Sequence, residues 1–146
     1  MTAAPAPLHR LAVRVYYEDT DAAGIVYHAN YLRFAERGRT EMLRSLGFGQ
    51  RRLRQEEGVG FAVRRCRADY LAPARLDDAL TVETRVAAIG AATLNLEQQI
   101  RRDDVTVAAL DVLVACLGRD GRPRRLPPAL RAAMSCRLNL PSSSQK

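Results

Sequence analysis

The segment NYLRFAERGRTEMLRSLG, residues 30–47, decides the fold, because its apolar residues recur at the spacing of one helical face. The residues on that face are Tyr31, Ala35, Met42 and Leu46. Asn30 suits the N-cap of such a helix, and Gly47 suits the position just after its end. The pattern predicts a helix over residues 31–46, about 24 Å long. Gly38 inside it costs about 1 kcal/mol relative to Ala, which favours the close approach of a neighbouring backbone.

Strand-like runs lie on both sides of this helix, and they span residues 11–17, 61–71, 80–89, 93–101 and 105–117. Hairpin-length connections between the last three predict antiparallel neighbours. A helix and a sheet with one apolar face each bury one another, so we predict an α+β domain in which an antiparallel sheet of about five strands wraps around one long central helix. The remaining sheet face and the edge strands predict a dimer or larger assembly.

The chain of 146 residues is long enough for one domain, which we place at residues 11–138. Residues 1–10 are small and Pro-rich, and residues 139–146 are polar, so both ends are expected to be disordered. The N-terminus carries no apolar segment typical of a secretion signal, and the longest apolar run, residues 105–117, is too short to span a bilayer. These features predict a soluble, cytoplasmic protein.

The net charge of +7 rests on 22 arginines and a single lysine, and the arginines are scattered along the sequence. Aromatic residues make up only 5% of the chain, so few rings are present to stack on bases. Both observations argue against nucleic-acid binding. The three cysteines are far apart and show no zinc-ligand spacing, which argues against a zinc site.

The segment VYYEDTDAAGIVYHANY, residues 15–31, contains nearly all the candidate catalytic groups, among them Asp19, Asp21 and His28. From Asp19 onward it begins like a calcium-binding loop, but the twelfth position, where such a loop needs an acidic residue, is Asn30. A metal site is not expected, because no second histidine or cysteine accompanies these residues. The motifs of serine hydrolases, P-loop nucleotidases and Rossmann oxidoreductases are absent from the sequence.

These residues place a carboxylate just before a helix, where unpaired backbone N–H groups and the positive end of the helix dipole stabilise a developing oxyanion. In a partly desolvated cleft, Asp21 would act as a base or a nucleophile on an activated ester. The alternative is structural: Asp21 forms an Asx-turn, and His28 is only the entry residue of the helix. The spacing alone leaves both interpretations open.

A family resemblance favours catalysis. The runs YYEDTDAAGIVYHANYLRFAERGR and GFAVRRCRADYLAPARLDDALTV resemble the signature of the hotdog-fold thioesterases of the 4-hydroxybenzoyl-CoA thioesterase type. They are most similar to the tol-pal-associated (YbgC-like) acyl-CoA thioesterases. The resemblance covers about residues 11–117, and it implies a hotdog fold and hydrolysis of an acyl thioester to a free acid and coenzyme A.

The resemblance also implies roles for individual residues. It makes Asp21 the general base or nucleophile, with Tyr17 and His28 orienting Asp21 and the attacking water. Backbone N–H groups near His28 and Ala29 would polarise the thioester carbonyl. Asn30 and Tyr31 match signature positions, and they are expected to position the substrate.

The implied substrate is an acyl-CoA or an acyl carrier protein thioester, and the implied assembly is a homodimer or homotetramer with the active site at a subunit interface. No metal or redox cofactor is implied. Arg64 and Arg65 are candidate contacts for the coenzyme A phosphates, although a solvated charged face is the simpler explanation of such arginines. Two alternative functions stay open, a non-catalytic hotdog binding protein of lipid or envelope machinery and a hotdog hydroxyacyl-thioester dehydratase.

Overall fold

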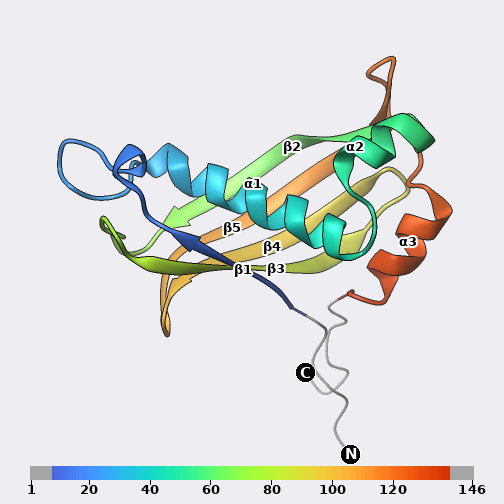
Figure 1. Ribbon diagram of the computed structural model, residues 1–146. Helices are drawn as coiled ribbons and strands as arrows, with labels where there is room; N and C mark the ends of the chain where they lie inside the picture. Colours follow the sequence, from blue (N-terminus) through green and yellow to red (C-terminus); the bar gives the residue numbers. More distant parts are fainter. Residues whose placement is uncertain (1–7, 139–146) are drawn as a thin grey trace, which may run out of the picture.

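A computed structural model describes residues 8–138 of the chain. Its five strands are β1 (His9–Arg14), β2 (Val59–Tyr70), β3 (Ala79–Ile89), β4 (Thr93–Arg102) and β5 (Val105–Gly118). They form one antiparallel sheet in the order β1-β3-β4-β5-β2 (Figure 1). The five-stranded antiparallel sheet predicted from the sequence is therefore confirmed. Strands β1 and β2 form its two edges.

Strand β1 begins earlier than the sequence suggested. His9 pairs with Thr84 of β3, and Arg10 pairs with Glu83. The Arg10 guanidinium also contacts the Glu83 carboxylate at 3.3 Å. The prediction that residues 1–10 are disordered is wrong for His9 and Arg10, because strand pairing holds them. Residues 1–7 and 139–146, for which disorder was also predicted, lie outside the described residues.

Helix α1 (His28–Ser45) lies across one face of the sheet (Figure 1). Its buried residues recur every three or four positions, as expected for a face packed on a sheet, and they are Asn30, Tyr31, Phe34, Ala35, Gly38, Met42 and Leu43. The helix ends as predicted, with Gly47 in the left-handed region at φ +89° just after it. Its start differs from the prediction, because the N-cap is Tyr27 and not Asn30.

Gly38 marks the closest approach between α1 and the sheet. A Cβ atom at this position would lie 2.6 Å from Cγ1 of Val82 and 3.1 Å from both Nε2 of Gln98 and Oγ1 of Thr84. A close approach was expected here, but the neighbours are side chains of β3 and β4 and not a backbone. Glycine at residue 38 therefore sets how closely the helix packs on the sheet.

The connection between α1 and β2 contains two short helices. They are α2 (Gln50–Arg52) and the single π-helical turn η2 (Leu53–Glu57). Only Leu53 is buried in this segment, so one apolar residue anchors it to the core. A further short helix, α3 (Pro128–Ser135), follows β5 and buries Leu130 and Met134.

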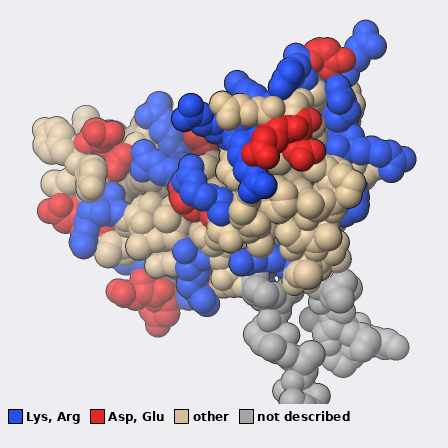
Figure 2. Space-filling view, turned by 45° about the vertical axis from the view of Figure 1, so that its right-hand side comes forward, with Lys and Arg blue, Asp and Glu red and all other residues tan. Residues whose placement is uncertain are grey.

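The surface of the described residues is polar and rich in arginine. On the face shown in Figure 2, basic side chains are interspersed with acidic ones. Among residues 8–138, no helix has the length and hydropathy needed to cross a membrane.

Candidate active site

The loop that carries Asp21 is a small closed structure between β1 and α1. Thr20 and Val26 form an antiparallel bridge at its base. Inside the loop, the N–H of Asp21 donates to the carbonyl of Ile25 at 2.9 Å, and the N–H of Gly24 donates to the carbonyl of Asp21 at 3.0 Å. Gly24 has φ +79°, a conformation that glycine adopts readily. These backbone hydrogen bonds hold the loop in a closed turn.

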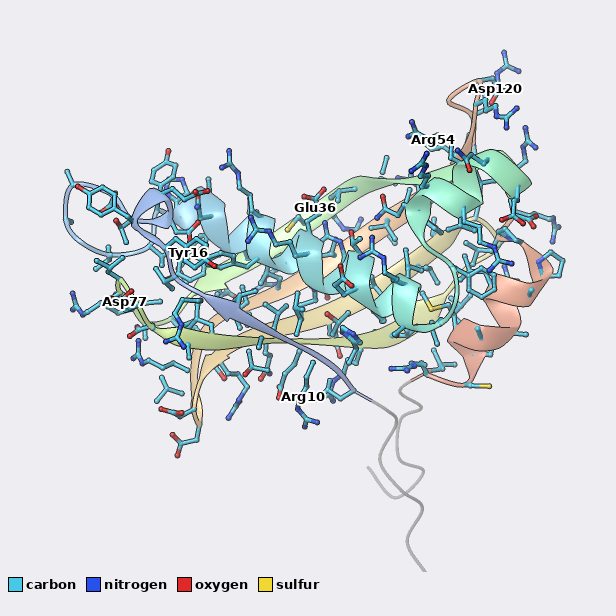
Figure 3. All side chains as sticks on the ribbon, in the orientation of Figure 1. Arg10, Tyr16, Glu36, Arg54, Asp77 and Asp120 are labelled. Carbon is cyan, nitrogen blue, oxygen red and sulfur yellow. The ribbon has the colours of Figure 1, made fainter. Side chains whose placement is uncertain are left out.

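The same loop is fixed to the segment between β2 and β3. The N–H of Val26 donates to the carbonyl of Ala74 at 2.8 Å, and Ile25 bridges Arg75. In return, the N–H of Ala74 donates to the hydroxyl of Tyr31 at 3.0 Å. Figure 3 shows Tyr16 and Asp77 at this end of the molecule, near the start of α1. The loop and the helix start are thus both attached to the segment between β2 and β3.

Helix α1 begins directly after this loop. Tyr27 is extended, its N–H donates to the carbonyl of Asp19 at 2.9 Å, and its carbonyl accepts from the N–H of Asn30 at 2.8 Å. Within the described residues, the backbone N–H groups of His28 and Ala29 have no backbone or side-chain acceptor. They point from the positive end of an 18-residue helix, where a developing oxyanion is stabilised.

The Asp21 side chain is exposed in the single chain. Its Oδ1 accepts a 2.8 Å hydrogen bond from the N–H of Ala23, which forms the Asx-turn expected under the structural alternative. The expected desolvated cleft is not formed around Asp21 by residues 8–138, because the loop projects beyond the sheet (Figure 1). One chain supplies the carboxylate and the helix start, and it leaves the carboxylate open to solvent.

The side chains of Tyr17 and His28 do not reach Asp21 in the single chain. Tyr17 is 84% exposed in the 3₁₀ turn η1 (Tyr17–Asp19), and only its carbonyl is engaged, by Thr20. His28 is exposed, and its ring centroid lies 4.5 Å from that of Tyr27. No hydrogen bond joins any two of the three predicted catalytic side chains within the described part of the chain.

A shallow apolar pocket lies beside the helix start. Its volume is about 340 Å³, and it is lined by Ile25, Val26, His28, Tyr31, Tyr70, Leu71, Ala72 and Pro73. The ring of His28 lies edge-on to Tyr70, with centroids 6.0 Å apart, and the rings of Tyr31 and Tyr70 are 5.6 Å apart. The pocket therefore joins the Asp21 loop, the first turn of α1 and the end of β2.

Tyr31 and Asn30 are neighbours in the first turn of α1, but their side chains have different surroundings. Burial raises the pKa of the Tyr31 phenol, and the hydrogen bond from Ala74 opposes this rise only in part, so the phenol is neutral at physiological pH. Asn30 is buried, and its Nδ2 donates to Oδ1 of Asp19 at 2.8 Å. Tyr31 thus contributes to the pocket, whereas Asn30 is part of the support beneath the loop.

Arg64 and Arg65 lie away from this pocket. Both are exposed in the middle of the edge strand β2, where the pairing with β5 shifts between Val63 and Arg65. Arg65 is five residues before Tyr70, which corresponds to about 17 Å along a strand. Within one chain they are therefore separated from the helix start.

Asp19 is a site residue whose structural role becomes visible only in the fold. It is 4% exposed, and both carboxylate oxygens accept hydrogen bonds, from the N–H of Tyr16 and from Asn30. The signal available in the sequence was the pair of acids Asp19 and Asp21 on either side of Thr20, but spacing alone does not reveal which one is buried. In residues 8–138 no group of three or more His, Cys, Asp or Glu side chains could hold a metal ion.

The comparison with known proteins agrees with this architecture. The sequence profile of the thioesterase-like superfamily matches residues 15–134. A solved structure described as a probable thioesterase from Bartonella henselae superposes with a TM-score of 0.81 at 40% identity. That match covers 83% of this chain and all of the solved one.

Two curated relatives cover most of both chains. The acyl-CoA thioesterase YbgC of Haemophilus influenzae is 47% identical over 123 residues, which is 83% of this chain and 90% of the relative. The acyl-CoA thioester hydrolase YbgC of Escherichia coli is 45% identical over 127 residues, which is 86% of this chain and 94% of the relative. The chain therefore belongs to the thioesterase-like superfamily and, within it, to the family of the YbgC acyl-CoA thioesterases.

Proposed function

We propose that this protein is an acyl-CoA thioesterase, which hydrolyses an acyl thioester to a free carboxylic acid and coenzyme A. The thioester carbonyl would lie against the N–H groups of His28 and Ala29, which stabilise the negative charge that develops on its oxygen. Asp21 would supply the base or the nucleophile. The pocket beside His28 and Tyr31 would accept the part of the acyl group nearest the carbonyl.

The observation that supports this proposal most strongly is the connection between the Asp21 loop and the start of α1. The loop closes at the bridge between Thr20 and Val26, and the next residue, Tyr27, is the N-cap of the helix. A carboxylate and two free N–H groups are therefore held on one rigid support. We infer that α1 is the central helix that a hotdog sheet surrounds.

Two chemical routes are consistent with a carboxylate at this position. As a general base, Asp21 takes a proton from water, and the resulting hydroxide equivalent attacks the carbonyl carbon and expels the thiolate. As a nucleophile, Asp21 forms a mixed anhydride with loss of the thiolate, and water then hydrolyses the anhydride. In both routes one water is consumed, and the thiolate leaves as coenzyme A after protonation.

We propose that a second copy of the chain completes the site. Asp21, Tyr17 and His28 are exposed in the single chain, and so is the outer strand β2. An exposed edge strand and an open catalytic carboxylate would both be covered in a homodimer or homotetramer. In such an assembly Arg64 and Arg65 of one copy would come within reach of the substrate phosphates bound by another.

The substrate carrier is proposed to be coenzyme A, with acyl carrier protein as the second candidate. Both present the acyl group on a phosphopantetheine arm, so the thioester chemistry is the same. No metal or redox cofactor is part of the proposed reaction. We propose the cytoplasm as the location of the protein.

The test is release of free thiol from a panel of acyl-CoA thioesters, for the wild type and for Asp21→Asn. An asparagine still accepts the hydrogen bond from Ala23, so the loop keeps its turn while the base is lost. We expect turnover to fall by about 10²-fold or more. The matched control is Glu18→Gln, which neutralises a nearby exposed acid and should leave turnover unchanged.

Other outcomes would identify the alternatives. An Asp21→Asn variant as active as the wild type overturns the proposed mechanism. A wild type that binds acyl-CoA without releasing thiol indicates a non-catalytic binding protein. Conversion of a hydroxyacyl thioester to the enoyl form without thiol release indicates a dehydratase.

A further inference from the structure

The carboxylate of Asp19 is the only charged side chain that is buried in the part of the chain that the structure describes. In residues 8–138 no Lys, Arg or His nitrogen lies within 4.0 Å of it. Burying an unpaired charge opposes folding unless hydrogen bonds hold it. The hydrogen bonds that this carboxylate accepts are therefore what hold it in the interior.

Asp19 connects three parts of the site. Its Oδ2 accepts from the N–H of Tyr16 at 2.7 Å, and its Oδ1 accepts from Nδ2 of Asn30 at 2.8 Å. Its backbone carbonyl accepts from the N–H of Tyr27 at 2.9 Å. These donors belong to the segment before the Asp21 loop, to the first turn of α1 and to the N-cap. Asp19 therefore joins both ends of the loop to the helix.

This arrangement sets the geometry between the proposed reacting groups. Asp21 follows Asp19 by two residues, on the far side of the bridge at Thr20. The N–H groups of His28 and Ala29 lie in sequence between Tyr27 and Asn30, both of which hydrogen-bond to Asp19. A shift of Asp19 would move the carboxylate of Asp21 relative to these N–H groups.

We propose that Asp19 is a positioning residue for thioester hydrolysis, which holds Asp21 in place relative to the free N–H groups of His28 and Ala29. The proposal rests on the proposed function, because it assigns Asp19 a part in that reaction. Asp19 does not touch the substrate. It acts through the loop and through Asn30.

The test exchanges the two partners of the buried hydrogen bond. Asn30→Asp places two carboxylates against each other. The double variant Asp19→Asn/Asn30→Asp restores one amide donor and one carboxylate acceptor, at the same net charge as the wild type. Misplacement of a catalytic group by about 1 Å costs about 10²-fold in rate. We therefore expect Asn30→Asp to lower kcat by about 10²-fold with KM changed by less than about threefold, and the double variant to recover most of the loss.

A second measurement follows the loop without relying on turnover. Hydrogen exchange at the amides of Val26 and Tyr27 should accelerate in Asn30→Asp and return toward the wild-type rate in the double variant. Thr84→Val is the matched control, because it removes a different buried hydrogen bond, from Nε2 of Gln98 at 2.9 Å, far along α1. It should leave kcat and the exchange of these two amides unchanged.

The outcomes separate the two proposals. A wild type that releases no thiol overturns the proposed function and this inference with it. An active wild type with an equally active Asn30→Asp variant overturns only the role of Asp19. The same holds if Asn30→Asp and Thr84→Val lose kcat in parallel and the double variant recovers none of it, because Asp19 would then contribute only to global stability.

Discussion

Nε2 of Gln98, in the middle of β4, donates a 2.9 Å hydrogen bond to the backbone carbonyl of Ala35 in α1. The same nitrogen donates to Oγ1 of Thr84 at 2.9 Å, and Oε1 of Gln98 accepts from Arg39 at 3.1 Å. Gln98 and Thr84 are fully buried, so the interface between the helix and the sheet contains a satisfied polar group. This contact joins the middle of α1 to the middle of the sheet.

Gly38→Ala tests how closely the helix packs. The added methyl group would lie 2.6 Å from Cγ1 of Val82, so a side chain or the helix must shift. We expect the free energy of unfolding to fall by about 1–3 kcal/mol in urea titrations, despite the higher helix propensity of alanine. Gly49→Ala is the control, because nothing lies within 4 Å of its added methyl group. Equal stability of Gly38→Ala and the wild type would contradict the packing described here.

Tyr31→Phe removes the hydroxyl that accepts from the N–H of Ala74. The buried N–H would lose its acceptor, and such a loss costs about 1–3 kcal/mol. Thermal or urea unfolding should show this cost. Tyr70→Phe is the control, since the Tyr70 side chain is 46% exposed and its hydroxyl makes no hydrogen bond within the described residues. If both variants unfold alike, the bond between Tyr31 and Ala74 contributes little.

His9 makes stability depend on pH. Burial and the nearby Arg137 lower the pKa of His9 below its ordinary value of about 6.5, and Glu41 opposes them only in part. The unfolded chain therefore binds more protons than the folded chain in this pH range. The contribution of His9 to stability is complete above pH 6.5, and it is lost as the pH falls through the lower pKa of the folded state. Urea titrations between pH 7.5 and pH 5 should show the wild type losing more stability than His9→Gln. Parallel pH profiles for the two proteins would rule out this assignment.

The open position of Asp21 predicts that activity depends on assembly. If a second copy covers the site, thiol release per subunit should fall when the protein is diluted below the concentration at which its subunits dissociate. Sedimentation at the same concentrations gives the assembly state directly. Constant activity per subunit from a protein that is monomeric throughout would show that one chain suffices.

The sequence predicted the sheet and the helix because each has a strong periodic pattern. The alternating burial in β3 and the buried face of α1 both appear as regular spacing of apolar residues. The start of α1 could not be predicted in the same way. Asn30 resembles an N-cap when read with its neighbours alone, but its side chain bonds to Asp19, eleven residues earlier. Local propensity carries no information about such a contact.

Two further features depended on contacts that a pattern does not contain. Leu53 is a single apolar residue in a polar segment, so the short helices around it gave no periodic signal. The exposure of Asp21 depends on which elements cover the loop, and this is a property of the folded chain. The sequence singled out Asp21, Tyr17 and His28 as candidates, whereas their separation within one chain became visible only in three dimensions.

The bridge between Thr20 and Val26 also separates two kinds of sequence constraint. On the side of the bridge next to α1, specific contacts are made by Asp19, Tyr27 and Asn30, and a substitution there disturbs the helix start. On the other side of the bridge, at the tip of the loop, Ala22 and Ala23 are exposed. Of these two residues, only Ala23 makes a hydrogen bond, through its backbone N–H. The tip can therefore change in sequence while the backbone framework that begins α1 stays the same.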